Sequence, residues 1–493
     1  MGADKAGFLL APLRPMRTFF SKISRNLVSF TGLLAVFVSA ALIITILAID
    51  ILGFHINPYI GILVYLILPA ILIFGVVLIP VGLALERRRQ HLQKGLPREL
   101  ALPRIELDLN RPDLRRRISW LVAVLAIFLS ILSTSAYKAV EFMDSVTFCG
   151  KVCHEVMEPE LVSYSQSPHS RVACVSCHIG PGAPWFVKSK ISGVRQVFAV
   201  TLNTYSKPIP VPVKDLRPAR ETCEQCHWPQ KFHGEQLKVI THFSEDEKNT
   251  PLKTVLLLRT GGGDKKTGIA EGIHWHMNIA NEISYIATDE ERQVIPWVRL
   301  KDLWGNVREY ATPDFNVPPE SLAKLPVRTM DCVDCHNRPT HIYKLPEEAV
   351  DEAMQARQVN PNLPFLKKVS VELLRREYPD KPQALRQIKG GLMDYYKQNH
   401  PALAAAWEED ILKAAEKLAE IYATNVFPSM KISWGTYKNN IGHMNFPGCF
   451  RCHDDNHASK DGKTIRQDCD QCHSLLAVDE ENPKPVIETL PLR

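Results

Sequence analysis

No cysteine in this chain stands alone, because its 12 cysteines fall into six closely spaced pairs. None is left over to cross-link distant segments. An excess of positive charge is also missing outside two short segments. Residues 1–26 carry +4 and residues 86–117 carry +5 of a net charge of +6, which leaves −3 for the rest. The chain therefore offers no basic surface of the kind that binds nucleic acid.

A phosphate-binding loop is missing as well. The segment Gly263–Thr267 has a Lys-Thr pair, but no glycine stands immediately before it and no strand–loop–helix pattern surrounds it. Nucleotide chemistry of that kind is therefore excluded.

What the chain does have is a histidine directly after every cysteine pair. The first motif, Cys149-Gly150-Lys151-Val152-Cys153-His154, has three residues between its cysteines, and the other five have two. Those five motifs are Cys174/Cys177/His178, Cys223/Cys226/His227, Cys332/Cys335/His336, Cys449/Cys452/His453 and Cys469/Cys472/His473.

Cys-x-x-Cys-His is the attachment signature of c-type haem. The two thiols bond to the porphyrin vinyl groups, and the adjoining imidazole becomes an axial ligand of the iron. Zinc ribbons and disulfides also use paired cysteines, but neither requires the neighbouring histidine. The pattern predicts six covalently attached haem c groups, with the six motif histidines as proximal ligands.

Three long apolar segments precede the motifs. Leu27–Ile49 is 23 residues without a charge, Gly61–Leu85 is 25 and Ile118–Tyr137 is 20. At about 1.5 Å per helical residue, each crosses a hydrocarbon layer of about 30 Å. A cleaved signal peptide is the alternative for the first segment, but its apolar run is too long and no small-residue cleavage site follows. We expect three transmembrane helices, over 27–52, 61–85 and 118–138.

The distribution of Lys and Arg predicts the orientation of these helices. The basic segments 1–26 and 86–117 belong in the cytoplasm, so the third helix leaves the membrane on the periplasmic side. Covalent haem attachment takes place on that side in bacteria. We therefore expect a multi-pass protein of the bacterial inner membrane, with its haem domain in the periplasm.

The expected fold is a mainly α, haem-organised multihaem cytochrome c. Residues 27–140 form the membrane anchor, and 141–240 carry the first three haem motifs. Strand-like composition over Thr254–Arg259 and Glu282–Ile286 predicts a small β-containing insertion over 241–330. Residues 331–493 carry the last three motifs and include an amphipathic helical segment, 346–424.

Low-spin electron-transfer haems need a second strong axial ligand, and a neutral imidazole supplies one. The distal candidates are the histidines near the motifs: His169, His233, His242, His274, His276, His341, His443 and His457. His274 and His276 are two residues apart, so on a strand they would point the same way. Met157 follows the first motif, where it is either a thioether ligand or an ordinary core residue.

The first two motifs, with Met157, resemble the NapC/NirT family of membrane-anchored multihaem cytochromes. Cys332-Val333-Asp334-Cys335-His336 and the trailing His341 resemble that family's fourth haem motif and its distal histidine. The similarity covers roughly 140–240 and 330–345, and the layout resembles the larger three-helix cytochromes of metal-respiring bacteria. The resemblance implies oxidation of menaquinol at the outer face of the membrane and delivery of electrons to periplasmic partners.

The resemblance also implies a quinol site in the segment after the second motif. Family lysines match Lys188 or Lys190 approximately, and Gln196 stands where some members have an acidic residue. From the residues themselves, Lys188, Lys190 and Arg195 could stabilise a developing quinolate. The alternative is a basic stripe that contacts lipid phosphate.

The sequence thus predicts a membrane-bound hexahaem cytochrome that acts as a quinol dehydrogenase. Its partners would be menaquinol, the lipid bilayer and a periplasmic c-type cytochrome or terminal reductase. One alternative is an electron-relay subunit whose quinone chemistry resides in another protein. Another is a haem-based sensor, which would need an open coordination position. Whether the chain forms a homo-oligomer or belongs to a larger complex is left open.

Overall fold

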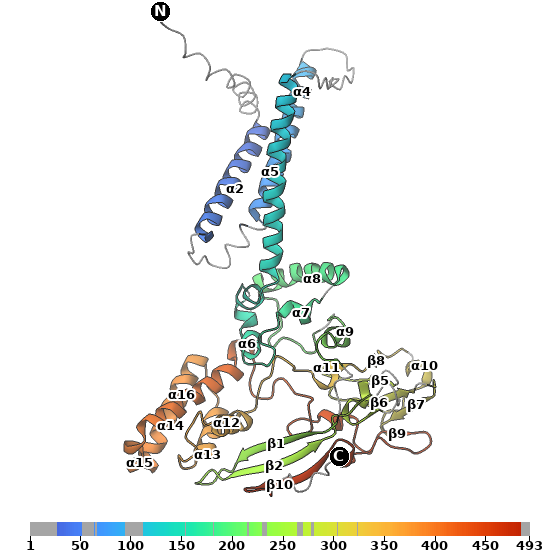
Figure 1. The fold of residues 1–493 in the computed structure, drawn as a ribbon, viewed down its shortest axis with the longest axis vertical. Coiled ribbons are helices and arrows are strands. Elements are labelled where there is room, and N and C mark those ends of the chain that lie inside the picture. The colour runs from blue at the N-terminus through green and yellow to red at the C-terminus, as the bar shows by residue number, and fades with distance from the viewer. Residues whose placement is uncertain are drawn as a thin grey trace, which may run out of the picture. The chain divides into compact units, whose positions relative to one another are not determined.

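The chain divides after Val152 into two units, Met1–Val152 and Cys153–Arg493, which we describe separately. The computed structural model (Figure 1) describes residues 27–51, 64, 67–93, 112–152, 154–180, 182–213, 216–228, 234–263, 270–277, 281–302, 304–322 and 324–484.

The described part of the N-terminal unit contains the long helices α2 (Leu27–Ile51), α4 (Leu68–Gln93) and α5 (Pro112–Met143), followed by the short helix η2 (Phe148–Val152). α2 and α4 pack closely, because glycines face each other where they meet. A Cβ atom added to Gly32 would lie 2.7 Å from the carbonyl oxygen of Gly75. Ser29 Oγ also donates a hydrogen bond to the carbonyl of Ile79, at 2.9 Å. Small residues of this kind let apolar helices approach without a water-driven core.

Two of the described helices are long and apolar enough to cross a membrane, over Leu27–Ile46 and Leu68–Arg88. The third expected span, 118–138, lies within the helix α5. Within the cytoplasmic loop expected over 86–117, α4 continues to Gln93 and α5 starts at Pro112. Arg, Glu, Gln and Leu are good helix formers, so the basic residues extend the apolar helices at little cost.

The second half of the C-terminal unit contains a helical layer. Its members are α12 (Pro346–Gln355), α13 (Leu366–Arg375), α14 (Lys381–Asn399), α15 (Pro401–Ala406) and α16 (Glu408–Asn425). Leu363, Leu374, Ile388, Leu392 and Ile411 are fully buried between these helices. This layer corresponds to the amphipathic segment expected over 346–424.

A buried ion pair connects the helical layer to the strands. Lys367 Nζ lies 2.5 Å from Asp351 Oδ1, and the same carboxylate oxygen accepts a hydrogen bond from Phe243 N at 3.0 Å. Both charged side chains therefore have partners, as burial requires. Asp351 thus fixes α12 against the end of β1 (Gln236–Phe243).

The strands form antiparallel sheets that join distant parts of the chain. One sheet has the order β1-β2-β10, where β2 is Pro251–Leu258 and β10 is His473–Glu480. A five-stranded sheet has the order β8 (Arg328–Thr329), β5 (Glu282–Ile286), β6 (Trp297–Lys301), β7 (Val307–Ala311) and β9 (Ala458–Ser459). A two-stranded ribbon joins β3 (Gly262–Gly263) to β4 (Ala270–Glu271).

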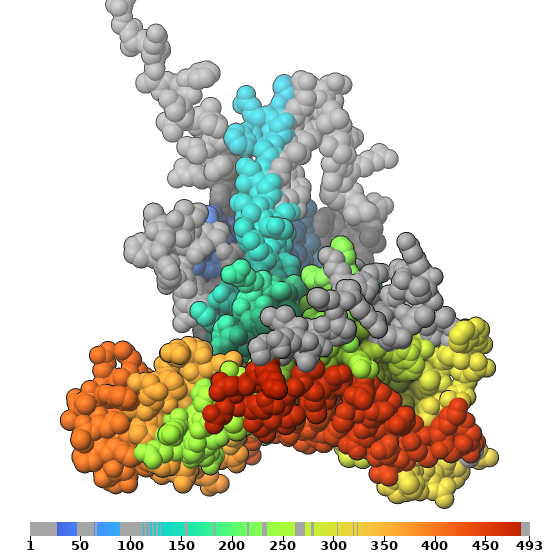
Figure 2. Space-filling model, turned by 60° about the horizontal axis from the view of Figure 1, so that its bottom comes forward, coloured from blue at the N-terminus to red at the C-terminus, as the bar shows by residue number. Residues whose placement is uncertain are grey.

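Strands occur within the insertion expected over 241–330 and also outside it. β1 begins earlier, and β9 and β10 come from the C-terminal haem-motif region. In Figure 2 the red C-terminal segment lies beside the green strands and extends toward the yellow residues of the five-stranded sheet. Pairing partners so far apart in sequence leave no local signal, which is why periodicity did not locate them.

The motifs of the C-terminal unit lie on short helical turns. α7 (Cys174–His178), α9 (Ala219–Cys223), α11 (Cys332–Cys335), η6 (Gly448–Arg451) and η7 (Cys469–Gln471) each contain at least one motif cysteine. The other helices of this unit are α6 (His154–Ser165), α8 (Ala183–Thr201), η4 (Ile273–Met277), α10 (Pro319–Leu322) and η5 (Pro428–Met430). Except for α6 and α8, all of these helices are about one turn long, so they depend on tertiary contacts to hold their shape.

We predict that Leu392→Ala destabilises the C-terminal unit by about 2–5 kcal/mol, because it leaves a cavity between α14 and its neighbours. Leu412→Ala is the matched control, since Leu412 is 50% exposed on α16. Thermal melting of the helical circular dichroism signal measures the difference. Equal melting temperatures for the two variants would show that the helical layer is not a packed core.

Candidate haem-binding sites

Five of the six motif histidines lie opposite a second histidine from another part of the chain. The distances between ring centres are 6.2 Å for His178 and His341, 6.0 Å for His227 and His169, 6.4 Å for His336 and His274, 5.8 Å for His453 and His276, and 6.1 Å for His473 and His443. The five second histidines are all among the distal candidates of the sequence.

These separations fit a metal held between two imidazoles. Two metal–nitrogen bonds of about 2 Å, plus about 1 Å from each bonded nitrogen to its ring centre, would place the ring centres roughly 6 Å apart. Two imidazoles in direct contact would have no reason to repeat that spacing five times. The residues present therefore fit a group with an iron between each pair.

The protein covers the cysteines of the second to sixth motifs to different degrees. Cys177, Cys226 and Cys469 are exposed, whereas the other cysteines of these motifs are half-buried. Cys226 thus differs from its motif partner Cys223, although both belong to one turn, in which Cys226 N donates to Cys223 O at 3.1 Å. This difference has no signature in the sequence, because both positions look alike in the motif. The role of Cys226 in haem attachment stays a prediction from the motif.

The second ring nitrogen of several of these histidines is occupied by a backbone carbonyl. Nδ1 of His169 lies 3.1 Å from Pro339 O, and Nδ1 of His274 lies 2.9 Å from Thr260 O. Nδ1 of His276 lies 2.8 Å from Ile273 O, and Nδ1 of His453 lies 3.0 Å from Arg466 O. Such contacts fix ring orientation and leave Nε2 for the metal.

Burial keeps several of these imidazoles in the neutral, ligating form. Burial lowers the pKa of His178, and the facing His341 lowers it further. The pKa values of His276 and His336 are lowered in the same way, first by burial and then by neighbouring histidines. A protonated imidazole has no lone pair for iron, so a lowered pKa favours ligation.

A buried arginine supplies a second test of the fit. Arg338 follows the fourth motif and is 6% exposed, yet its Nε and Nη2 have no hydrogen-bond partner among the described residues. Its guanidinium stacks on the Tyr437 ring at 4.1 Å. The charge of Glu160 attracts the guanidinium, but buried N–H groups without an acceptor remain costly. A haem carries two propionate carboxylates, which are the partners that such a group lacks.

One short 3₁₀ helix provides two of the facing histidines. His274 and His276 both lie on η4, where His274 faces the fourth motif and His276 faces the fifth. The strand considered for them is wrong. On a 3₁₀ helix successive side chains turn by about 120°, so residues two apart diverge and can serve different sites.

Backbone hydrogen bonds set the position of η4. Arg259 O accepts from Ile273 N at 2.8 Å, and Arg259 N donates to Cys472 O at 2.8 Å. Arg259, the residue after β2, thus connects the sixth motif to η4. The histidines of η4 face those of the fourth and fifth motifs.

Other candidates lie elsewhere. His457 is 1% exposed, with Nδ1 at 2.8 Å from Asp454 Oδ1 and Nε2 at 2.6 Å from Ile295 O. Both ring nitrogens are occupied, so proximity to a motif was misleading for this residue. His242 Nε2 lies 3.7 Å from Asp479 Oδ1 near the surface, and no motif histidine faces it among the described residues. His233 lies outside the described residues.

The first motif is described only in part. Cys153 and the side chain of His154 lie outside the described residues, whereas Cys149 lies on η2. Met157 packs beside the apolar cluster of Val156, Tyr343 and Phe427. This is the environment of a core residue, the alternative to ligation.

Helix α8 carries all four residues of the expected quinol site. Lys188 Nζ lies 5.1 Å from the Trp185 ring centre, and Lys190 Nζ lies 4.7 Å from that of Phe186. Gln196 Nε2 donates to Ser192 Oγ at 3.2 Å. The same helix exposes an apolar stripe with the spacing of one helix face. The stripe is Val187, Ile191, Val194 and Phe198. With Arg195 included, α8 is an amphipathic, purely basic helix.

Hydrogen bonds join the third motif to the fourth and the fourth to the fifth. Asp331, which caps α11, accepts from Ala219 N at 2.7 Å and Arg220 N at 2.9 Å at the start of α9. Arg451 Nη2, on η6, donates to the carbonyl of Asp334 at 2.6 Å.

The thiols of other successive motifs are also close. Burial raises the pKa of Cys177, and the next largest cause is the thiol of Cys223, with a smaller contribution from Cys226 of the same motif. Burial raises the pKa of Cys335 to about 11, with Cys449 as the next cause. Cys449 likewise raises the pKa of Cys472, after burial. The second to sixth motifs therefore follow one another in space in the order of the sequence.

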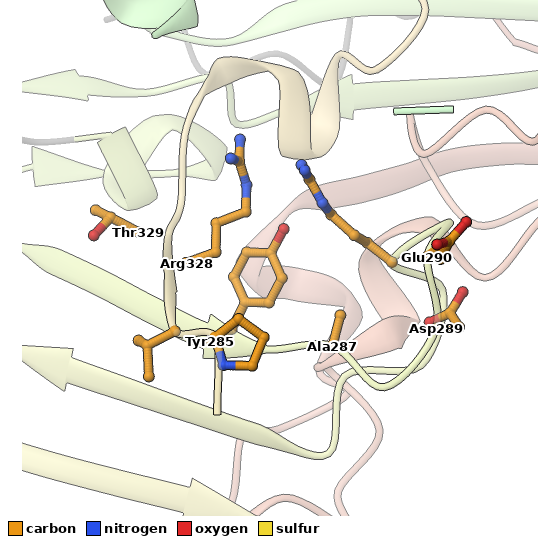
Figure 3. A pocket seen from close by; sticks show the side chains of 9 residues that line it. Tyr285, Ala287, Asp289, Glu290, Arg328 and Thr329 are labelled. Atoms are coloured by element: carbon orange, nitrogen blue, oxygen red, sulfur yellow. The ribbon is translucent and has the colours of Figure 1, made fainter. Parts of the chain in front are cut away.

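Sequence reasoning missed Asp334, which it saw only as a variable residue inside the fourth motif. Asp334 is 3% exposed and accepts hydrogen bonds from Tyr285 Oη at 2.6 Å and Arg328 Nε at 2.8 Å. Arg292 Nη1 lies 3.3 Å away. The Tyr285 and Arg328 side chains border a pocket of about 500 Å³, opposite Asp289 and Glu290 (Figure 3). Since Asp334 already engages both arginines, the network positions α11.

Comparisons with known proteins agree with these motifs. The N-terminal region of the NapC/NirT cytochrome c family matches residues 112–209. The chain is 43% identical over 457 residues to the cytochrome c-type protein ImcH of Geobacter sulfurreducens, which covers 93% of this chain and 89% of ImcH. No solved structure matches the chain. With nearly its whole length aligned to such a relative, the chain belongs to the NapC/NirT cytochrome c family.

Proposed function

We propose that the chain is a membrane-anchored hexahaem cytochrome c that oxidises menaquinol and relays the electrons to a periplasmic cytochrome or reductase. The observation that carries this proposal is the set of five histidine pairs at the spacing of a doubly ligated iron. When bound, each haem supplies one-electron transfer without an open coordination position. The distal ligands in this proposal are His341, His169, His274, His276 and His443, for the second to the sixth motif.

The order of the attachment sites favours a relay over independent haems. Hydrogen bonds join the third motif to the fourth and the fourth to the fifth. The cysteines of the second and third motifs, and of the fifth and sixth, lie near enough to affect each other electrostatically. Electron transfer weakens steeply with distance, so sites that adjoin in sequence order make an unbranched route from the second motif to the sixth. The first motif, at the end of the membrane anchor, is where electrons would enter.

For the anchor we propose three spans, with α5 as the third, and the cysteine motifs on the periplasmic side. The basic residues at the ends of α4 and α5 support a cytoplasmic connection between them. α8 would then supply the quinol site at the membrane surface. Its apolar stripe can enter the lipid interface, while Lys188, Lys190 and Arg195 stabilise the quinol oxygen as its proton leaves. Gln196 would hydrogen-bond the headgroup but cannot accept that proton as a carboxylate would.

The presence of Gln196 also favours a second candidate function. Without a carboxylate on α8, the chain could be a relay subunit whose quinone chemistry lies in another protein, with α8 bound to lipid phosphate. A haem-based sensor is disfavoured, because five of the six motifs already have a facing histidine.

We predict that His341→Ala and His443→Ala each convert one haem from low spin to high spin and leave the others unchanged, because each removes one distal ligand. Electron paramagnetic resonance of the oxidised, detergent-purified protein measures the change. His242→Ala is the control and should leave the spectrum unaltered. A fully low-spin spectrum in both distal variants would contradict the ligand assignment.

The quinol site makes a separate prediction. Replacing Lys188, Lys190 and Gln196 together by alanine should slow reduction by a menaquinol analogue by on the order of 10²-fold, since it removes groups that stabilise the developing anion. Stopped-flow absorbance of the haem bands measures the rate. Lys397→Ala on α14 is the control for loss of a distant basic side chain, and dithionite should still reduce all haems in both proteins.

Two results would separate the candidate functions. Fast quinol reduction of the parent protein that is lost only in the triple variant supports a quinol dehydrogenase with its site on α8. If quinol does not reduce the parent protein at a useful rate, the relay function is favoured and the quinone site lies in a partner.

A further inference from the structure

The histidine that faces the second motif has a partner unlike the others. His341 Nδ1 lies 3.0 Å from the carboxylate oxygen Oε2 of Glu160. It is also 3.1 Å from the backbone carbonyl of Glu160 and 3.3 Å from Ser163 Oγ. Glu160 and Ser163 both lie on α6, which begins at the first motif histidine.

For the other distal candidates that face a motif histidine, the described contacts of Nδ1 are with neutral groups. His169, His274 and His276 each meet a backbone carbonyl. Among these described contacts, the one with a charged group is that between His341 and the carboxylate of Glu160. The side chain of Glu160 is only 14% exposed, so solvent screens its charge weakly.

The charge of Glu160 acts on two buried neighbours. Burial lowers the pKa of Arg338 and Glu160 opposes this shift, whereas Glu160 adds to burial in raising the pKa of Tyr343. His178, the proximal histidine of the second motif, lies beyond His341. Arg338 carries the opposite charge to Glu160, so loss of the carboxylate would leave a net positive charge beside the second attachment site.

His341 Nδ1 is hydrogen-bonded to the backbone carbonyl of Glu160, and the Glu160 carboxylate acts beside it through its charge. A carboxylate this close to the outer nitrogen of an axial histidine raises the basicity of the imidazole. A more basic ligand donates more electron density to iron and favours the ferric over the ferrous state. A nearby negative charge acts in the same direction. A backbone carbonyl does both to a smaller degree, because it carries only a partial charge.

We propose that Glu160 is a positioning residue for the second attachment site and, through His341, lowers the reduction potential of the haem bound by Cys174 and Cys177. This inference rests on the proposed function, in which His178 and His341 are the axial ligands of that haem. Glu160 thereby sets the difference in reduction potential between the haems at the second and third attachment sites. Electrons would cross this difference on the route away from the membrane.

The experiment is a redox titration of the complete, detergent-purified protein with Glu160→Gln. The substitution keeps the shape and a hydrogen-bonding group but removes the charge. The low-spin signals are followed by electron paramagnetic resonance and by absorbance. The expected result is that one component titrates at a higher potential by about 59 mV, a tenfold change in its reduction equilibrium, while the others stay in place. Glu160→Asp, which retains the charge, should shift that component less.

Glu158→Gln is the matched control. Glu158 is on the same helix and loses the same charge, but it lies near the surface and pairs with Lys381 Nζ at 3.0 Å. It should leave every component unshifted. The inference is overturned if Glu160→Gln shifts nothing, or if Glu158→Gln shifts the same component equally.

His341→Ala separates this inference from the proposed function. If that variant stays fully low spin, His341 is not a ligand and the ligand assignment itself fails. If it produces a high-spin haem while Glu160→Gln leaves all potentials unchanged, the ligand assignment stands and only the role of Glu160 is wrong.

Discussion

The central constraint in the C-terminal unit is that five described motif histidines each face a second imidazole, at a spacing that fits one metal ion. The motif helices are too short to be stable alone, and α7, α9 and α11 have five residues or fewer. Their facing histidines come from segments far away in the sequence, so each pair closes a long loop. Ligation would therefore tie the unit together much as disulfides tie small secreted domains, with iron as the link.

Polar contacts also connect neighbouring motifs to each other. Asp331 serves α9 and α11 at once, and Arg451 reaches from η6 to the backbone of Asp334. Each of these charges is partly buried and has several partners, so its burial is compensated. Removing Asp331 or Arg451 would disturb two attachment sites at once. The spacing between neighbouring sites therefore depends on contacts between motifs and not on any single motif.

The sequence predicted the parts of this arrangement that have local signatures. The motifs, the apolar helices α2 and α4, the helical layer and the strand Glu282–Ile286 could all be read from spacing or periodicity. The pairing of histidines could not, because His457 and His443 both lie near a motif and only tertiary structure shows that His457 Nε2 is bound to Ile295 O. Glu160 was missed for the same reason, since its partner His341 is distant in sequence.

The region between the third and fourth motifs illustrates what such long-range contacts achieve. Taken alone, 241–330 looks like an insertion that interrupts a series of haem motifs. In the folded chain β2 pairs with β10, which begins at the sixth motif histidine, and the backbone of Arg259 after β2 hydrogen-bonds to η4. His274 and His276 then face two different motif histidines from different sides of this short helix. The inserted strands are thus the scaffold that allows the C-terminal motifs to join the series, because without η4 two of them would lack a facing imidazole.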